Sequence, residues 1–247
     1  MTKLLSIVVL ALTFFIGLNE KGNSINTFTK DKTINHSAWD NLLKKHVSKN
    51  GDVNYKAFQQ DAEKLNTYID YLATKIPSEN WSKQEKLAYY INVYNANTIK
   101  LIIENYPTKS IKDIKNPWSK KLIKIGNDLF SLSNIEHDIL RNMDETRIHF
   151  AINCASKSCP KLMNIAYTTE NVETLLELAA KAFINDPKKN KISKENVQLS
   201  KIFDWYKKDF TKNGSLKNYI NQYSQVKIDS KAKITYLEYD WRLNVQH

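Results

Sequence analysis

Two cysteines with four residues between them stand in the stretch 147–160, RIHFAINCASKSCP, and they are the only cysteines of the chain. Cys154 and Cys159 allow three kinds of chemistry: a disulfide that closes a small loop, a nucleophilic thiolate, or two ligands of a zinc site. Zinc normally requires four ligands, and the chain has no second paired-ligand motif. From the residues alone, a disulfide or a buried thiol pair ranks first, thiol catalysis second and zinc third.

Thiol catalysis requires a base near the sulfur and a group that orients this base. His137 and His149 are the candidate bases, and the polar residues Glu136 and Glu85 are candidate orienting groups. The side chain of Asn153, together with the backbone N–H groups of Cys154 and Ala155, is a candidate oxyanion hole.

The alternation of Ile148, Phe150 and Ile152 with polar or small residues predicts a strand over residues 147–152. The turn-forming residues that follow place Cys154 where this strand opens into a loop. On such a strand His149 lies too far from Cys154 to be its obvious base, so His137 is the preferred partner.

A capping box is expected where Ser133 precedes Glu136 by three residues, at the start of a short helix. On this helix His137 and Arg141 are one turn apart, beside Glu136. The alternative is a surface helix with an incidental histidine, and composition alone favours that alternative.

The segment 83–105 predicts a long buried helix that begins after Ser82. A polar stripe on this helix contains Glu85, Asn92 and Asn95. The two asparagines are expected to tie loop backbones into the core, which ranks above a direct part in chemistry, because buried amides need partners.

Periodicity predicts further helices near 37–47, 56–76, 168–186, 202–210 and 216–223, a β-hairpin at 121–130, and strands at 192–199 and 232–243. No repeat, linker or composition break divides residues 25–247. We therefore expect a single helix-rich α+β domain packed on a small central β-sheet.

Residues 1–24 combine Lys3, an apolar run from Leu4 to Leu18 and small residues near Ser24, which predicts a signal peptide and an exported, periplasmic or extracellular protein. The apolar run is too short to span a bilayer, and no transmembrane segment is expected in the mature chain. The net charge of +11 is spread along the chain without a nucleic-acid motif, so weak attraction to anionic surfaces is expected and nucleic-acid binding is not.

Five segments in this order, KLAYYINVYNANTI, SLSNIEHDILR, HFAINCASKSCP, SKIFDWYKKDF and YDWRLN, resemble the DUF547 family, a domain of unknown function in secreted bacterial and plant proteins. The resemblance runs from Trp39 to Asn244. It implies that Glu136 and His137 match the family's Ile-Glu-His motif and that Cys154 and Ser156 belong to its Cys-Gly/Ala-Ser motif.

The resemblance also implies that neither Cys159 nor His149 is obligatory, because related plant sequences can carry other residues there. This weakens a required disulfide and a Cys-His-Cys zinc site. The remaining set, Cys154, His137 and Glu136, is similar in logic to papain-like and transglutaminase-like thiol enzymes, with the histidine and cysteine in an order that requires a permuted or convergent arrangement.

The resulting hypothesis is an exported thiol-dependent hydrolase or acyltransferase that acts on an amide bond in peptide or cell-wall-like material, without a cofactor or metal. Cys154 attacks, His137 accepts and returns the proton, and Glu136, Asn92 or Asn95 orients the imidazole. The supporting set also contains Glu85, Arg141, His149, Asn153 and Ser156. The competing class is a non-catalytic binding or scaffold domain in which Cys154 and Cys159 form a structural disulfide.

Overall fold

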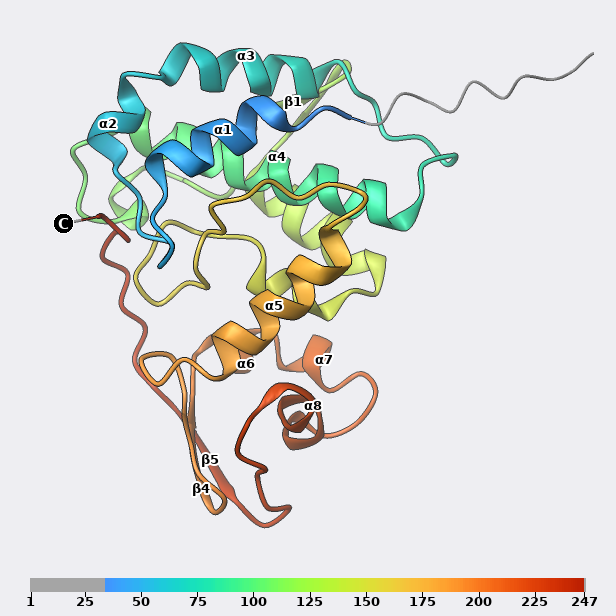
Figure 1. Cartoon of the computed structure of the whole chain (residues 1–247), viewed down its shortest axis with the longest axis vertical. Helices are drawn as coiled ribbons and strands as arrows, with labels where there is room; N and C mark the ends of the chain where they lie inside the picture. Colours follow the sequence, from blue (N-terminus) through green and yellow to red (C-terminus); the bar gives the residue numbers. More distant parts are fainter. Residues whose placement is uncertain (1–33, 247) are drawn as a thin grey trace, which may run out of the picture. The chain divides into compact units, whose positions relative to one another are not determined.

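Helix α4 (Lys83–Glu104) runs through the centre of the part of the chain that the computed structural model describes, residues 34–246 (Figure 1). The helix begins where predicted, because the Ser82 hydroxyl accepts a hydrogen bond from the backbone N–H of Glu85 at 3.1 Å. Buried residues occur on every side of it, from Leu87 to Ile103. The predicted signal peptide, residues 1–24, lies outside the described residues.

Helices α2 (Tyr55–Gln59) and α3 (Ala62–Ala73) pack against α4, and α1 (Ser37–His46) packs against α2 and α3. The single helix predicted for residues 56–76 is wrong, since it breaks at Asp61. The Asp61 carboxylate is nearly buried, and it accepts bonds from Lys45, His46 and Lys64. These contacts hold Asp61 at the junction between the two helices, because a buried carboxylate needs hydrogen-bonding or charged partners.

The β1–β2 hairpin (Ile123–Ile125, Asp128–Phe130) has the predicted antiparallel pairing, with Gly126 at a φ of +60° in its turn. A second sheet contains β3 (Lys191–Ile192), β4 (Asn196–Leu199) and β5 (Lys233–Tyr236), in which β4 and β5 are parallel. The fold is α+β, as predicted. Its sheets are small, and helix α4 rather than a sheet occupies the centre.

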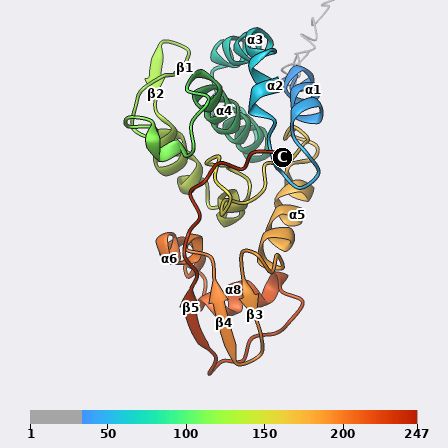
Figure 2. The same cartoon turned by 90° about the vertical axis from the view of Figure 1, so that its left-hand side faces the viewer.

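Helices α5 (Val172–Ile184), α6 (Ile202–Trp205), α7 (Lys207–Phe210) and α8 (Leu216–Tyr223) surround a second core beside the three-stranded sheet (Figure 2). The rings of Phe150, Phe183, Phe203 and Phe210 lie in mutual contact there. Full burial of each ring stabilises the fold by roughly 1.5–3 kcal/mol. This core supports the segment that leads to Cys154.

The strand predicted for residues 147–152 is wrong. Thr146–Phe150 forms the 3₁₀ helix η4, and Glu145 caps its start. The Glu145 carboxylate accepts hydrogen bonds from the backbone N–H and the guanidinium of Arg147. Ile148, His149 and Phe150 are all buried, so the apparent alternation does not separate an inner from an outer face. Cys154 therefore follows a short helix.

Beyond β5 the chain runs back across the molecule to the α1–α4 layer, as both views show (Figures 1 and 2). Isolated bridges pair Leu243 with Ser156 and Val245 with Val53. The strand predicted for residues 232–243 is thus correct only for residues 233–236. The return of this C-terminal segment brings residues 239–243 against the cysteine loop. Among residues 34–246, no helix has the length and apolar character needed to cross a membrane.

Candidate functional site

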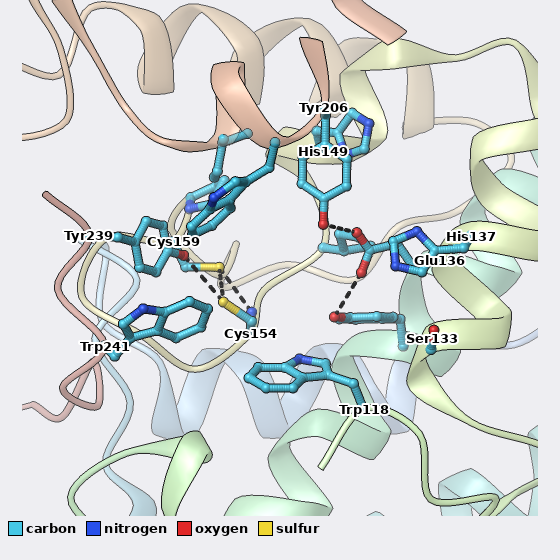
Figure 3. Close-up of a pocket in the computed structure, with 15 residues that line it drawn as sticks. Trp118, Ser133, Glu136, His137, His149, Cys154, Cys159, Tyr206, Tyr239 and Trp241 are labelled. Atoms are coloured by element: carbon cyan, nitrogen blue, oxygen red, sulfur yellow. Dashed lines mark hydrogen bonds between the residues drawn. The ribbon is translucent and has the colours of Figure 1, made fainter. Parts of the chain in front are cut away.

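Both cysteines border a cavity of about 340 Å³ that opens between helix α4, the cysteine loop and the C-terminal segment (Figure 3). The wall also includes helix α6 and the π-helix η2 (Asn134–Ile139). The lining side chains come from Tyr94, Trp118, Ser133, Glu136, His137, His149, Ile152, Cys154, Cys159, Pro160, Ile202, Trp205, Tyr206, Tyr239 and Trp241.

Three polar groups surround the sulfur of Cys154. The sulfur of Cys159 lies 2.9 Å away, and the hydroxyl oxygens of Ser156 and Tyr239 each lie 3.3 Å away. The Ser156 and Tyr239 hydroxyl oxygens also lie 3.0 Å from each other, within hydrogen-bond distance. Both cysteines are free thiols in this structure.

These donors favour the thiolate of Cys154. The S–H of Cys159 contributes most, and with Ser156 and Tyr239 it outweighs the opposing effect of burial, so the pKa of Cys154 falls to about 7. Burial and the neighbouring Cys154 sulfur raise the pKa of Cys159 well above its ordinary value. Cys154 is therefore the more readily ionised thiol of the pair, and Cys159 is its proton-bearing neighbour.

Asn95 and Asn153 hold the cysteine loop by hydrogen bonds between their side-chain amides and the backbone. Asn95 donates to the carbonyl of Ala151 at 3.0 Å and accepts the N–H of Asn153 at 2.9 Å. Asn153 in turn donates across the loop to the carbonyl of Pro160 at 2.6 Å. Asn92 makes an equivalent pair of bonds with the backbone of Tyr167. The expectation that the asparagines of α4 tie loop backbones into the core is confirmed.

The predicted oxyanion hole is wrong in this conformation, because its donors are engaged. The N–H of Cys154 donates to the Cys159 sulfur at 2.9 Å, and the N–H of Ala155 donates to the Asn153 side chain at 2.8 Å. Ala155 also adopts the left-handed conformation, with φ at +58°. This conformation costs a non-glycine residue roughly 1 kcal/mol, and it turns the chain sharply after Cys154.

Glu136 points into the molecule from the π-helix η2, a helix type that recurs at functional sites. Its two carboxylate oxygens accept hydrogen bonds from the hydroxyls of Tyr206 and Tyr94, the latter at 3.3 Å. The predicted capping box at Ser133 is wrong, since Ser131 and Asn134 cap this turn instead. Glu136 is consequently free of a capping role and lines the cavity.

His137 lies exposed at the cavity wall, and no hydrogen bond of the described residues joins it to Cys154 or to Glu136. Its Nδ1 is 3.1 Å from a guanidinium nitrogen of Arg141. Since arginine can only donate, Nδ1 accepts and the neutral ring carries its proton on Nε2. This contact favours hydrogen-bond donation from Nε2 of His137 over the expected role, in which His137 accepts the proton of the thiol.

Arg141 continues a chain of polar contacts to His149. Its guanidinium binds both carboxylate oxygens of Asp209, at 2.7 and 2.9 Å, and the same carboxylate accepts from His149 Nε2 at 2.8 Å. These bonds lower the pKa of Asp209, whereas burial lowers the pKa of His149 despite the neighbouring carboxylate. His149 is therefore a buried neutral ring, stacked on Tyr206 at 4.0 Å between centroids.

The remaining predicted site residue, Glu85, lies in the first turn of α4 and does not line the cavity. The sequence reasoning missed Trp118, Trp205, Tyr206, Tyr239 and Trp241, which form the aromatic wall. The only signal for them was their density in segments far along the chain from Cys154. As to a metal, residues 34–246 contain no group of three or more histidine, cysteine or acidic side chains arranged to hold one.

A comparison with family models matches residues 78–184 to a family described as "Protein of unknown function, DUF547". This segment contains Glu136, His137, Cys154 and Cys159, and it is shorter than the resemblance expected from Trp39 to Asn244. No curated protein and no solved structure matches the chain. Residues 78–184 of the chain are therefore similar to the DUF547 family.

Proposed function

We propose that the protein is a thiol-dependent hydrolase or acyltransferase that acts on an amide bond, with Cys154 as its nucleophile. The observation that carries the proposal is the environment of the Cys154 sulfur. Cys159, Ser156 and Tyr239 lower its pKa to about 7, and it borders a cavity large enough for a small substrate group. A thiolate at neutral pH needs no base for the first attack.

In the first step, the Cys154 thiolate adds to the carbonyl carbon of the substrate. The C–N bond then breaks, the amine leaves after its nitrogen takes a proton from water, and a thioester remains on Cys154. Water, or a second amine, next attacks the thioester carbon. The thiolate leaves, and the proton of the attacking group is released, which restores the starting state.

Glu136 and His137 lie on the wall of the same cavity and assist the reaction in this proposal. Arg141 holds Nδ1 of His137, so the Nε2–H of His137 donates a hydrogen bond to the carbonyl oxygen and stabilises the negative charge that forms there. Glu136 is the acidic side chain of the cavity and accepts the proton of the second nucleophile. Arg141 and Asp209 act as positioning residues, because they contact His137 and His149 rather than the reacting thiol.

The signal-peptide pattern of residues 1–24 supports export, and with it a substrate outside the cytoplasm, such as peptide or cell-wall-like material. This part of the proposal rests on sequence. Secretion of the full chain from an expressing cell, followed by mass analysis of the new amino-terminus, tests it. Processing near residue 24 is expected, and retention of Met1 in an intracellular product contradicts it.

One observation favours a second candidate. The 2.9 Å separation of the sulfurs of Cys154 and Cys159 also suits a non-catalytic binding or scaffold domain with a disulfide there. Thiol labelling separates the two candidates. The enzyme proposal expects iodoacetamide to modify Cys154 of the native protein rapidly at neutral pH without reductant. The scaffold proposal expects no label until the protein is reduced.

A further inference from the structure

The cavity beside Cys154 has a charge opposite to that of the whole chain. The sequence carries 37 lysines and arginines, yet among the described residues none of these lines the cavity. Its acidic side chain is Glu136, which is 6% exposed and held by two tyrosine hydroxyls. A buried carboxylate without a cationic partner in the same cavity leaves room for a cation from outside.

The positive charge of the Arg141 guanidinium interacts with the Glu136 carboxylate. Arg141 borders a different cavity, and both of its bonds to carboxylate go to Asp209. Because His149 is neutral, one negative charge remains when Glu136, Asp209 and Arg141 are taken together. The Cys154 thiolate, on the wall of the same cavity, adds to this negative potential.

Aromatic rings form the rest of the wall near Cys154. Trp205, Tyr239 and Trp241 contact one another, with ring centroids 4.5–5.7 Å apart. Trp118 packs edge-on against Trp241, and Figure 3 shows Trp118, Tyr239 and Trp241 around Cys154. Ring faces attract ammonium groups, and the attraction grows when water is excluded. Trp241 already shows this capacity, since Nζ of Lys112 lies 5.3 Å from its centroid.

From the combination of a carboxylate, several aromatic rings and the absence of a lining cation, we infer that this cavity binds substrates through an amine or alkylammonium group. The cationic group lies among the aromatic rings within the field of Glu136, and the carbonyl that reacts lies at Cys154. The inference rests on the proposed function for the identity of the reacting bond, and it adds the substrate class. Substrates with a carboxylate at this position are disfavoured.

A matched pair of small probes tests the inference without any reaction. Choline and 3,3-dimethylbutan-1-ol have the same shape, but only choline is charged. Calorimetry with the full chain, supported by tryptophan fluorescence from Trp118, Trp205 and Trp241, measures both affinities. We expect choline to bind at least about tenfold more tightly than its neutral isostere. Equal affinities, or no binding of either probe, overturn the inference.

Variants then identify the residues that produce the preference for choline over its neutral isostere. Glu136→Gln removes the charge and should bring the two affinities to within about threefold of each other. Asp138→Asn, an exposed change on the same helix, is the matched control and should leave the ratio unchanged. If the Glu136 variant does not fold, Trp241→Leu is the second variant, with a selective loss of choline affinity expected. A ratio that survives both substitutions contradicts the inference.

The same binding assay on Cys154→Ala separates this inference from the proposed reaction. The cation preference should persist in that variant, although the variant has no thiol at position 154 to acylate. Native protein that binds choline but is never acylated on Cys154 would refute the reaction alone. Acylation of Cys154 in a protein with no preference for choline would refute the substrate class alone.

Discussion

The sulfur atoms of Cys154 and Cys159 lie 2.9 Å apart, and the two thiols have opposite tendencies to ionise. The S–H of Cys159 stabilises a negative charge on Cys154, while burial and the Cys154 sulfur keep Cys159 protonated. Cys159 therefore favours ionisation of Cys154.

The rate of Cys154 alkylation should rise with pH and reach half of its maximum near pH 7, because only the thiolate reacts. Cys159→Ala removes the strongest donor and should move the midpoint toward the ordinary cysteine value of about 8.5. Cys159→Ser retains a hydroxyl donor and is the matched control, with a midpoint closer to that of the native protein. Stopped-flow alkylation measures all three. Identical midpoints in native protein and the alanine variant would show that Cys159 does not activate Cys154.

Mild oxidation should join the two cysteines. The Cys154 thiolate attacks a small-molecule disulfide and displaces one of its thiolates, and Cys159 then loses its proton and attacks Cys154 to release the second thiol. The protein loses two hydrogen atoms, and Cys154 no longer reacts with iodoacetamide until a reductant is added. Intact mass and peptide mapping measure the change. A stable mixed disulfide on Cys154 with no internal bond would contradict the prediction.

Asn95→Ala should destabilise the fold strongly. The variant leaves the carbonyl of Ala151 and the N–H of Asn153 without partners inside the protein. Each orphaned group costs about 1–3 kcal/mol, so the loss of both should lower the free energy of unfolding by about 2–6 kcal/mol. Asn97→Ala, on the same helix, loses only a bond to the carbonyl of Val93 and should change it by less than about 1 kcal/mol. Urea unfolding of the two variants checks the difference, and equal losses would argue against the tethering role of Asn95.

Stability should decrease as the pH falls from 7 toward 5. Burial lowers the pKa of His149, so the unfolded chain binds a proton below about pH 6.5 while the folded protein still excludes it. His36, with a pKa lowered by burial to about 4, acts in the same direction. Asp209 contributes only at lower pH, since its lowered pKa stabilises the fold above the unfolded value of about 3.9.

Denaturant unfolding of native protein, His149→Gln and His36→Gln at pH 7 and pH 5.5 tests this pH dependence. Each substitution should reduce the slope, which for a single proton is at most about 1.4 kcal/mol per pH unit. Slopes that do not change in either variant would show that these rings are not excluded from protonation in the folded state.

Much of the helical framework could be predicted from the sequence. Helix α4 was expected within one residue of its bounds, α8 at its observed bounds, and the β1–β2 hairpin at its observed turn. These elements depend on local signals, namely periodicity, a serine cap and a Gly126-Asn127 turn. The buried partners of Asn92 and Asn95 also followed from the need to satisfy amides in an apolar helix.

The site was less predictable because distant contacts determine it. The apparent strand at 147–152 is helical, since Phe150 packs in the core formed with α5, α6 and α7 while Ile148 and Ile152 pack in the core that contains α4. Tyr239 reaches Cys154 only because the C-terminal segment crosses the cysteine loop, 85 residues along the chain. Likewise, the contact of Arg141 with His137 was visible as a one-turn spacing, but its consequence for the ring tautomer required the bond to Nδ1.

The central claim is that Cys154 carries the acyl group during turnover, and time-resolved mass spectrometry of the acid-quenched protein tests it most directly. The full chain is mixed with an activated ester, such as the p-nitrophenyl ester of a carboxylic acid that carries an alkylammonium group. We predict one acyl group per chain on Cys154, which forms and then disappears as product accumulates, no adduct in Cys154→Ala, and a persistent adduct in Glu136→Gln. An adduct on another residue, or an acyl group that stays on Cys154 of the native protein, would contradict the claim.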